Sequence, residues 1–466
     1  MKLIASRLTD ALGLGPPVAS RSRSRDDSPA INGVGGRRRS IISNDNYDCD
    51  IDDDGAIFVY RLVRGYPNIV PKNVRRVRVD HSVRVIGERA FYDCRKLIHL
   101  ELNEGLEEIR DRAFRNCELL KVVKVPRSVK LIDDSAFRDC VSLVEVELWC
   151  GEEGDGVGND DDEREGGGGK GGMEDDEKKK VKGNLVQIGW GAFRNCYMLR
   201  AVRIPASVIE ICHEAFRDCK SLSNLIIHDG VQIIRKDAFR DCHSLTSIII
   251  PPTVREIGVS AFHDCRMLSN LILNDGLEMI DDMAFAECKS IIHVIVPPTV
   301  KSLGVESFSY CENLSEVVLY DGLESIGDGA FLECISLSGI DVPKTVRSID
   351  RMAFGKCAKL ERATFHDDGL LAEIADYAFR GCSSLSEMKV PKSVRSIGYE
   401  VFRDCTSLER VDIMEGLERI GFNAFWDCGS LMFVMLPRSI VAIVGARLGE
   451  GQVAIPSSIP TFVFNR

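Results

Sequence analysis

Apolar residues recur at a spacing of about 23 residues along most of the chain, and each period predicts a short strand, a turn and a return segment. In the unit that spans residues 265–288, Leu271 and Leu273 are two positions apart and therefore point to the same face of a strand. The Asp-Gly pair at 275–276 then turns the chain. Because one such unit is too short to bury this face alone, we expect each coil to stack on its neighbours.

A Phe-x-x-Cys motif marks the period, in most coils with a small residue before the Phe. The motif occurs fourteen times, and its spacing is constant except for one much longer interval, from Phe137 to Phe193, and one slightly longer, from Phe354 to Phe379. The phenylalanines are Phe91, Phe114, Phe137, Phe193, Phe216, Phe239, Phe262, Phe285, Phe308, Phe331, Phe354, Phe379, Phe402 and Phe425. Glycine turns and proline turns alternate between coils, so the sequence repeats most faithfully at every second coil, which indicates duplication of a two-coil unit.

The full repeat reads Leu-x-x-hydrophobic-x-hydrophobic, a Pro or Asp-Gly turn, Val-x-x-Ile-Gly and Ala-Phe-x-x-Cys. It resembles the BspA-like leucine-rich repeat family over residues 68–445. We therefore expect a repeat solenoid, a leucine-rich-repeat-type right-handed coil of about 23-residue units. A parallel short-stranded sheet would form one face, and short helical or irregular segments the other. The resemblance implies a curved solenoid for protein recognition or adhesion, and no reaction.

The register predicts the remaining organisation of the chain. Residues 1–46 are expected to be a disordered basic, Ser-rich tail, residues 47–80 an N-terminal cap, 81–445 the solenoid and 446–466 a C-terminal cap or tail. The long interval after Phe137 exceeds one period by the length of an insertion at 151–183. That insertion has 12 acidic and 6 basic residues and 11 glycines, so we expect a disordered loop. It is either a tolerated surface expansion or an acidic contact or modification site.

Composition narrows the classes of function. Sixty basic and 71 acidic residues give a net charge of −11, which argues against a nucleic-acid partner, and 44% hydrophobic residues exclude a wholly disordered chain. No apolar run is long enough to cross a bilayer, and residues 1–16 lack the apolar run of a secretory signal. We expect an intracellular, cytoplasmic location. A transit peptide is the alternative, because the charged side chains within residues 1–25 are all basic except Asp10.

The sequence predicts no metal site, cofactor or catalytic centre. Asp50 to Ile57 resemble part of a calcium loop, but Arg61 stands where a bidentate Glu is required, so an Asp-Gly turn is favoured. Neither zinc-type ligand pairs nor a nucleophile elbow or phosphate-binding loop occurs in a suitable context. The repeated cysteines are expected to be small, buried and reduced, and the Asp or Asn before many of them to lie in solvated charged rows. We expect a protein that is not an enzyme.

One outward strand position forms an apolar stripe. Strand side chains alternate between faces, and five successive coils carry an aliphatic residue at this outward position: Ile226, Ile249, Ile272, Ile295 and Val318. The same position is charged or polar in most other coils. Polar or aromatic residues flank the stripe, with Asn224, Ser247, Asn270, His293 and Glu316 on one side and His228, Asn274 and Tyr320 on the other.

We interpret this stripe as the site that binds a protein or peptide ligand, with self-association as a further possibility. The competing interpretation is that Ile and Val simply favour strands and were copied by duplication. Because other coils place Asp, Lys or Arg at this position, the backbone does not require an aliphatic residue. The alternative function is surface adhesion or recognition outside the cell, as the family resemblance implies.

Overall fold

The computed structural model describes residues 57–61, 69–148 and 184–437 in full, and also the backbone of four short strands. These four are β1 (Cys49–Asp50), β3 (Leu62–Val63), β4 (Tyr66–Pro67) and β34 (Phe462–Phe464). The chain divides into two units, Met1–Tyr47 and Asp48–Arg466, and every described residue belongs to the second. The tail predicted for 1–46, the insertion at 151–183, most of the segment 446–466 and most of the calcium-loop outline lie outside the described residues.

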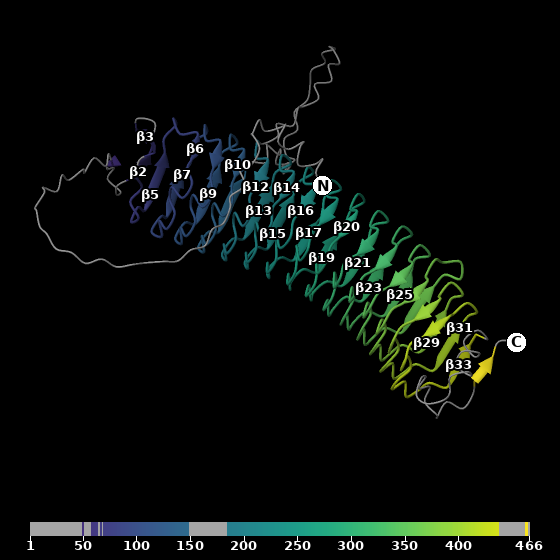
Figure 1. Ribbon diagram of the computed structural model, residues 1–466. Helices are drawn as coiled ribbons and strands as arrows, with labels where there is room; N and C mark the ends of the chain where they lie inside the picture. Colours follow the sequence, from purple (N-terminus) through teal and green to yellow (C-terminus); the bar gives the residue numbers. More distant parts are fainter. Residues whose placement is uncertain are drawn as a thin grey trace, which may run out of the picture. The chain divides into compact units, whose positions relative to one another are not determined.

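The described chain is a parallel β-solenoid in which nearly every coil carries one longer and one shorter strand (Figure 1). The longer strands are β5 (Arg76–Val79), β7 (His99–Glu101), β9 (Val122–Val125), β11 (Glu145–Leu148), β13 (Ala201–Ile204), β15 (Asn224–Ile227), β17 (Ser247–Ile249), β19 (Asn270–Ile272), β21 (His293–Ile295), β23 (Glu316–Val318), β25 (Gly339–Val342), β27 (Arg362–Phe365), β29 (Glu387–Val390), β31 (Arg410–Ile413) and β33 (Phe433–Leu436). The expected solenoid is thereby confirmed. The segment between the strands consists of turns, and the described residues contain no helix.

The shorter strands form one continuous parallel sheet along the solenoid. They are β6 (Val85–Ile86), β8 (Glu108–Ile109), β10 (Leu131–Ile132), β12 (Gln187–Ile188), β14 (Glu210–Ile211), β16 (Ile233–Ile234), β18 (Glu256–Ile257), β20 (Met279–Ile280), β22 (Ser302–Leu303), β24 (Ser325–Ile326), β26 (Ser348–Ile349), β28 (Glu373–Ile374), β30 (Ser396–Ile397) and β32 (Arg419–Ile420). In this sheet Ile132 of β10 pairs with Ile188 of β12. The coil register therefore resumes directly after the undescribed segment.

The longer strands form several smaller sheets. Their hydrogen-bonded groups are β1-β2-β5-β7, β9-β11-β13-β15, β17-β19, β21-β23, β25-β27 and β29-β31-β33-β34, where β2 is Ile57–Tyr60. Each break follows a coil with a glycine turn and precedes a coil with a proline turn. From β15 to β29, the two-coil period of the sequence is therefore also the period of hydrogen bonding in this sheet.

Threonine side chains connect the coils across three of these breaks. The Gly230 N–H donates to Thr253 Oγ1 at 3.0 Å, and the Thr253 hydroxyl donates to the Val231 carbonyl at 2.8 Å. The same glycine bond joins Gly276 to Thr299 and Gly322 to Thr345. The following proline turn therefore holds the N–H group of the glycine, while the preceding proline turn leaves no room for a side chain there, because a Cβ on Gly276 would lie 2.5 Å from the Pro252 carbonyl oxygen.

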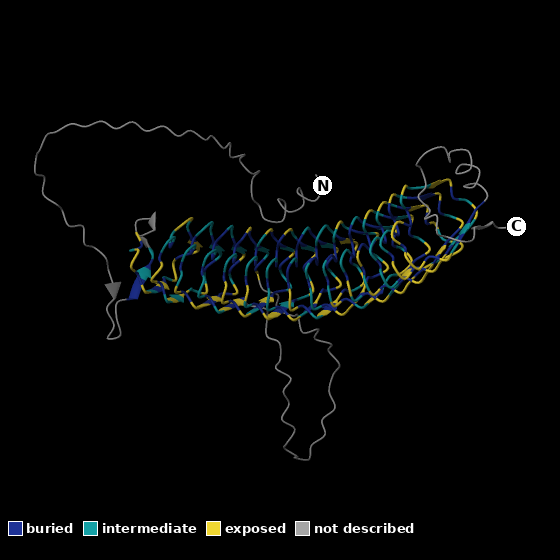
Figure 2. Cartoon of the chain, turned by 90° about the horizontal axis from the view of Figure 1, so that it is seen from below, coloured by how far each residue is buried: buried dark blue, intermediate teal, exposed yellow. Residues whose placement is uncertain are grey.

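A stack of phenylalanines fills the interior. The Phe-x-x-Cys rings are fully buried, and successive ring centroids lie 4.8–5.9 Å apart with planes within 16° of parallel. At the N-terminal side, Tyr60 of β2 continues the stack onto Phe91 with centroids 4.9 Å apart. Buried residues line the inside of the coils and exposed residues the outside (Figure 2). Each ring therefore packs against the rings of the neighbouring coils within one continuous hydrophobic core.

The thiols of the repeated cysteines donate hydrogen bonds to backbone carbonyl groups inside the core. The Cys265 thiol donates to the carbonyl of Phe239 in the preceding coil at 3.4 Å, and Cys288 donates to Phe262 at 3.2 Å. The same bond recurs from Cys117 to Cys428. All fifteen described cysteines are free and buried. Because only the protonated thiol can donate, these residues contribute as neutral side chains.

The turn segment around the Phe-x-x-Cys motif forms the third side of each coil, and residues at fixed positions in it have a left-handed backbone conformation. Around Phe239, both Asp237 and Asp241 have positive φ, 55° and 60°. This conformation points the N–H groups of Asp237, Phe239 and Asp241 at carbonyls of the next coil, with distances of 2.8–2.9 Å. Asp and Asn tolerate the left-handed region better than most residues. The acidic residue before many cysteines therefore has a backbone role in addition to its charge.

We expect Gly276→Ala to destabilise the solenoid by about 1–3 kcal/mol. Gly276 has a φ of 110°, and an added Cβ would lie 2.5 Å from the Pro252 carbonyl oxygen. Urea unfolding followed by circular dichroism measures the change. Gly87→Ala is the matched control because nothing lies within 4 Å of its Cβ position. Equal unfolding midpoints for the two variants would contradict the tight packing of the glycine turn.

We expect stability to fall as pH rises above about 9, because burial raises the pKa of the core thiols. The pKa of Cys94 rises to about 11 and that of Cys428 to about 12, and burial raises the pKa of the Cys265 thiol well above its usual range. An unfolded thiol loses its proton near pH 8.5, so above that pH the unfolded chain binds fewer protons than the folded one. Urea midpoints between pH 7.5 and 10.5 test this, with Cys265→Ala and Cys288→Ala together as the comparison. If the urea midpoint of the double variant fell with pH as steeply as that of the wild type, the thiol explanation would be contradicted.

Candidate functional site

The outward side chains of five neighbouring strands form the candidate site. Ile226, Ile249, Ile272, Ile295 and Val318, termed the stripe, lie on β15, β17, β19, β21 and β23. Ile249, Ile272 and Ile295 are 55%, 40% and 53% exposed, whereas Ile226 and Val318 are half-buried. Their neighbours along the backbone, such as Ile248 and Leu271, are buried. The structure therefore places the stripe on the outer face of the sheet.

Strand register aligns the members of the stripe with one another. Ile249 pairs with Ile272 across β17 and β19, and Ile295 pairs with Val318 across β21 and β23. At the N-terminal end, Ile226 pairs with Arg203 of β13. The row of aliphatic side chains therefore begins next to a cationic side chain. At its other end it meets the exposed Asp341 on β25.

The flanking residues differ in how free they are to contact a ligand. Asn224, Asn270, His293 and Tyr320 are exposed. The Asn270 amide donates to Ser247 Oγ at 3.1 Å. The Asn274 amide donates to the Ile250 carbonyl at 2.8 Å, so this residue mainly holds its own coil to the preceding one. His228 is half-buried.

A groove of about 580 Å³ opens beside the N-terminal half of the stripe. It lies between β15 and β17, where the ladder of longer strands is broken. Its lining includes Ile226 and Ile249 of the stripe, Asn224 and Ser247 beside them, and Asp229 in the glycine turn. The sequence did not reveal this groove, because it arises from the break in the ladder.

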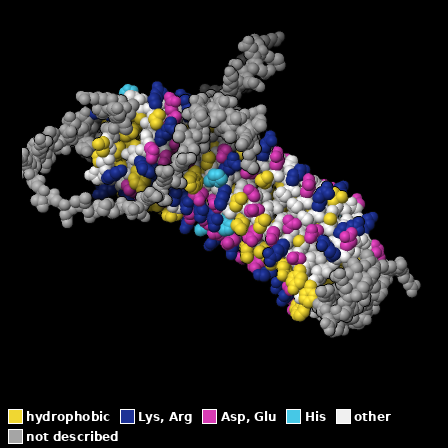
Figure 3. All heavy atoms as spheres, viewed as in Figure 1, with side chains coloured by type: hydrophobic (Ala, Val, Ile, Leu, Met, Phe, Trp, Pro, Cys, Tyr) yellow, Lys and Arg dark blue, Asp and Glu magenta, His cyan; other side chains and the backbone are white. Residues whose placement is uncertain are grey.

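A second groove of about 680 Å³ lies at the corresponding break between β7 and β9. Charged side chains such as Arg76, Glu101 and Lys124 line it. Lys124 is also paired with Glu147 at 2.9 Å. Apolar side chains such as Leu102 and Val122 line this groove as well, so it differs from the first one by the charged side chains at its rim and by lying outside the stripe. Figure 3 shows that acidic and basic side chains are interspersed over the visible face of the solenoid, with smaller apolar groups between them.

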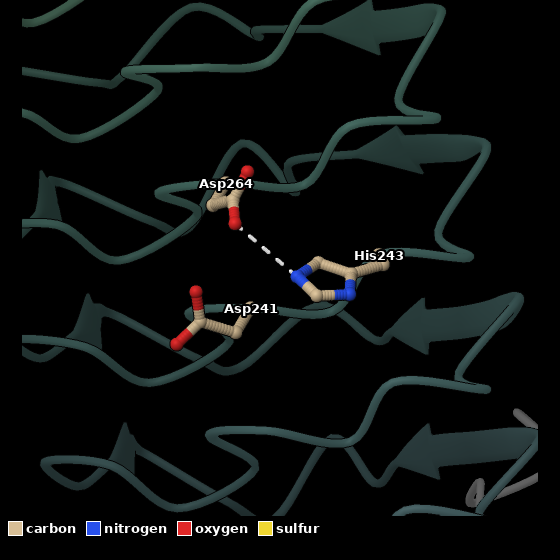
Figure 4. Close-up of side chains that lie close together, drawn as sticks. All are labelled: Asp241, His243 and Asp264. Atoms are coloured by element: carbon tan, nitrogen blue, oxygen red, sulfur yellow. Dashed lines mark hydrogen bonds and ion pairs between the residues drawn. The ribbon is translucent and has the colours of Figure 1, made fainter.

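One side-chain cluster has the composition of a metal site. Asp241 and His243 belong to one coil and Asp264 to the next (Figure 4), and their ligand atoms all lie within 4.8 Å of one another. His243 Nε2 lies 3.2 Å from Asp264 Oδ2. This cluster is not visible in the sequence, since its members come from two coils.

The carboxylate of Asp264 in this cluster is already paired with neighbouring side chains. Arg266 donates to both oxygens of Asp264, at 2.6 and 2.9 Å. Burial raises the pKa of Asp264, but the hydrogen bonds and charge of Arg266, together with His243, outweigh it and hold that pKa below its usual value. A cation would have to displace the guanidinium. The arrangement is better suited to linking two coils than to binding a metal.

The core thiols are unsuited to nucleophilic chemistry. Their pKa values are raised by burial, so the reactive thiolate is disfavoured at neutral pH.

Within the described residues, no helix is long and apolar enough to cross a membrane.

Coil length, parallel strands and the inward apolar positions define a leucine-rich-repeat solenoid. The chain belongs to the BspA type leucine rich repeat family, whose model describes a region of six copies and matches residues 71–153, 186–315 and 301–432. No curated protein matches the chain.

Solved structures include similar solenoids. A leucine-rich repeat protein from Bacteroides ovatus is 25% identical, with a TM-score of 0.65, and the match covers 82% of this chain and 87% of that one. A leucine rich cell surface protein from Faecalibacterium prausnitzii is 21% identical with a TM-score of 0.38, covering 71% and 82%. A leucine-rich repeat protein from Eubacterium ventriosum is 19% identical with a TM-score of 0.42, and the match covers 70% of this chain and 82% of that one. The first of these supports the same fold.

We expect Ile249→Asp to lower the free energy of unfolding by less than about 1 kcal/mol, because the side chain lies in water. Ile248→Asp is the matched variant, one residue away and buried. It should cost about 4 kcal/mol or more, since it buries an unpaired charge. Thermal and urea unfolding compare the two. If Ile249→Asp unfolded as early as Ile248→Asp, the stripe would belong to the core.

Proposed function

We propose that this protein is a non-enzymatic scaffold that recognises a protein or peptide through the stripe and its flanking residues. The observation that carries the proposal is a row of outward aliphatic side chains on five neighbouring coils, of which Ile249, Ile272 and Ile295 are exposed. Exposed apolar patches with a polar rim commonly mark interaction sites. Membership of a leucine-rich repeat family agrees with a binding role.

Strand propensity alone is a weaker account of the stripe. The outward position is Lys124, Asp341 and Lys389 in other coils with the same backbone. Those coils fold without an aliphatic residue there. Exposing the apolar side chains of Ile249, Ile272 and Ile295 to water is unfavourable, and the fold does not require aliphatic residues at these positions.

The proposed setting is inside the cell. Its support is the set of fifteen free, buried cysteines, none of which forms a disulfide among the described residues. Reducing compartments keep such thiols in this form. The donated thiol hydrogen bonds in the core also require that the sulfur atoms stay protonated.

Affinity capture with three forms of the full chain tests the proposal. The Ile249→Ser, Ile272→Ser double variant should lose ligands that the wild type retains, because it removes apolar contact area without adding charge. Ile335→Ser is the matched control, since Ile335 is an exposed aliphatic residue outside the stripe and outside the lining of both grooves. Quantitative mass spectrometry compares the captured proteins, and light scattering shows whether the ligand is a second copy. Equal capture by all three forms, with unchanged unfolding, would contradict recognition through the stripe.

A further inference from the structure

A row of acidic side chains borders the stripe along one edge of the solenoid. Asp229, Asp275 and Asp321, termed the acidic edge, occupy the glycine turns that follow β15, β19 and β23, and all three are exposed. Asp321 lies 3.3 Å from Lys344, with both side chains half exposed. Within residues 69–148 and 184–437, Asp229 and Asp275 form no ion pair with a basic side chain. Asp229 and Asp275 are therefore the members of the edge whose negative charge no described basic side chain compensates, whereas Lys344 partly compensates Asp321.

The groove brings this charge together with the apolar surface. Asp229 lines the same groove as Ile226 and Ile249. A side chain with an apolar stem and a cationic head could lie along the two isoleucines and place its charge at Asp229. Lysine and arginine have this form. An acidic or purely aliphatic side chain would leave the Asp229 carboxylate without a partner.

The spacing along the edge sets a period for the ligand. The three aspartates occur in alternate coils, so neighbours are two coils apart, about 10 Å at the usual strand spacing. A peptide in the extended polyproline II conformation advances about 3.1 Å per residue with three residues per turn, so every third side chain points the same way. Three peptide residues therefore span the distance between two carboxylates. The intervening proline turns expose Pro252 and Pro298, which suit apolar or small residues of the ligand between its cationic ones.

We infer that the ligand of the stripe is an extended basic segment with Lys or Arg at every third residue, running along the stack of coils. This inference rests on the proposed function and specifies the chemistry of its partner. The apolar residues of the segment cover the stripe, and the cationic residues pair with the acidic edge. The chain's own basic tail does not fit, because Arg21, Arg23 and Arg25 recur at every second residue.

Fluorescence anisotropy of synthetic peptides on the full chain tests this inference. The probe is a labelled peptide of five Lys-Val-Thr repeats. A peptide of the same composition with its lysines in one block tests the period, and Gln-Val-Thr and Glu-Val-Thr repeats test the charge. We expect the Lys-Val-Thr probe to bind about fivefold or more tightly than each of the others, and to weaken as salt is raised.

Matched variants locate the binding. Asp229→Asn with Asp275→Asn should weaken the Lys-Val-Thr probe by about fivefold or more, whereas Asp368→Asn, in the glycine turn after β27 and outside the stripe, should not. Ile249→Ser with Ile272→Ser should also weaken it. Equal binding by the Asp229→Asn, Asp275→Asn variant would overturn the inference.

The outcomes separate this inference from the proposed function. If the neutral peptide bound as tightly as the Lys-Val-Thr probe and depended on Ile249 and Ile272 but not on the aspartates, recognition through the stripe would stand and the basic ligand would be overturned. If the stripe variant bound the Lys-Val-Thr probe like the wild type, attraction would be general charge, and the inference would fail. Failure of the Lys-Val-Thr probe to bind at all would overturn it too, whatever the affinity capture shows.

Discussion

Stacking of each coil on the next is the interaction on which the whole structure depends, because no coil encloses a core of its own. Three contacts repeat at every step. The phenylalanine rings stack, the cysteine thiols donate to carbonyls of the preceding coil, and N–H groups on the third side donate to the next coil. None of these contacts involves a side chain on the outer face of the longer strands. Outward positions can therefore differ between coils, and the surface can specialise without cost to the fold.

Much of the fold could be predicted from the spacing of apolar residues, because inward and outward positions alternate in a strand. Leu271 and Ile272 show this, since their neighbouring positions fix opposite environments. The left-handed residues could not be predicted in the same way. Asp241 was interpreted as part of a solvated row, yet its φ of 60° and its N–H bond to His263 depend on the next coil. That requirement comes from a residue one full coil further along the chain, so no local pattern contains it.

The candidate site was predictable to a similar extent. The alternation placed Ile249 on the surface, and the structure agrees. The groove beside it was not predictable, because it lies at a break between β15 and β17. In the sequence this break is visible only as the change from a glycine turn to a proline turn. The cluster of Asp241, His243 and Asp264 likewise needed the relative placement of two coils.

The break that recurs every second coil also determines how such a chain can change in length. Removing or adding a pair of coils would preserve the alternation of turns, and with it the Gly276–Thr299 type of link across each break. Removing a single coil would place two turns of the same kind next to each other and leave one such link without its partner. Between β15 and β29, a change by one pair of coils thus preserves these links, whereas a change by a single coil does not. In the coils of the stripe each pair carries one turn aspartate, Asp229, Asp275 or Asp321, so an added pair would lengthen the acidic edge by one carboxylate.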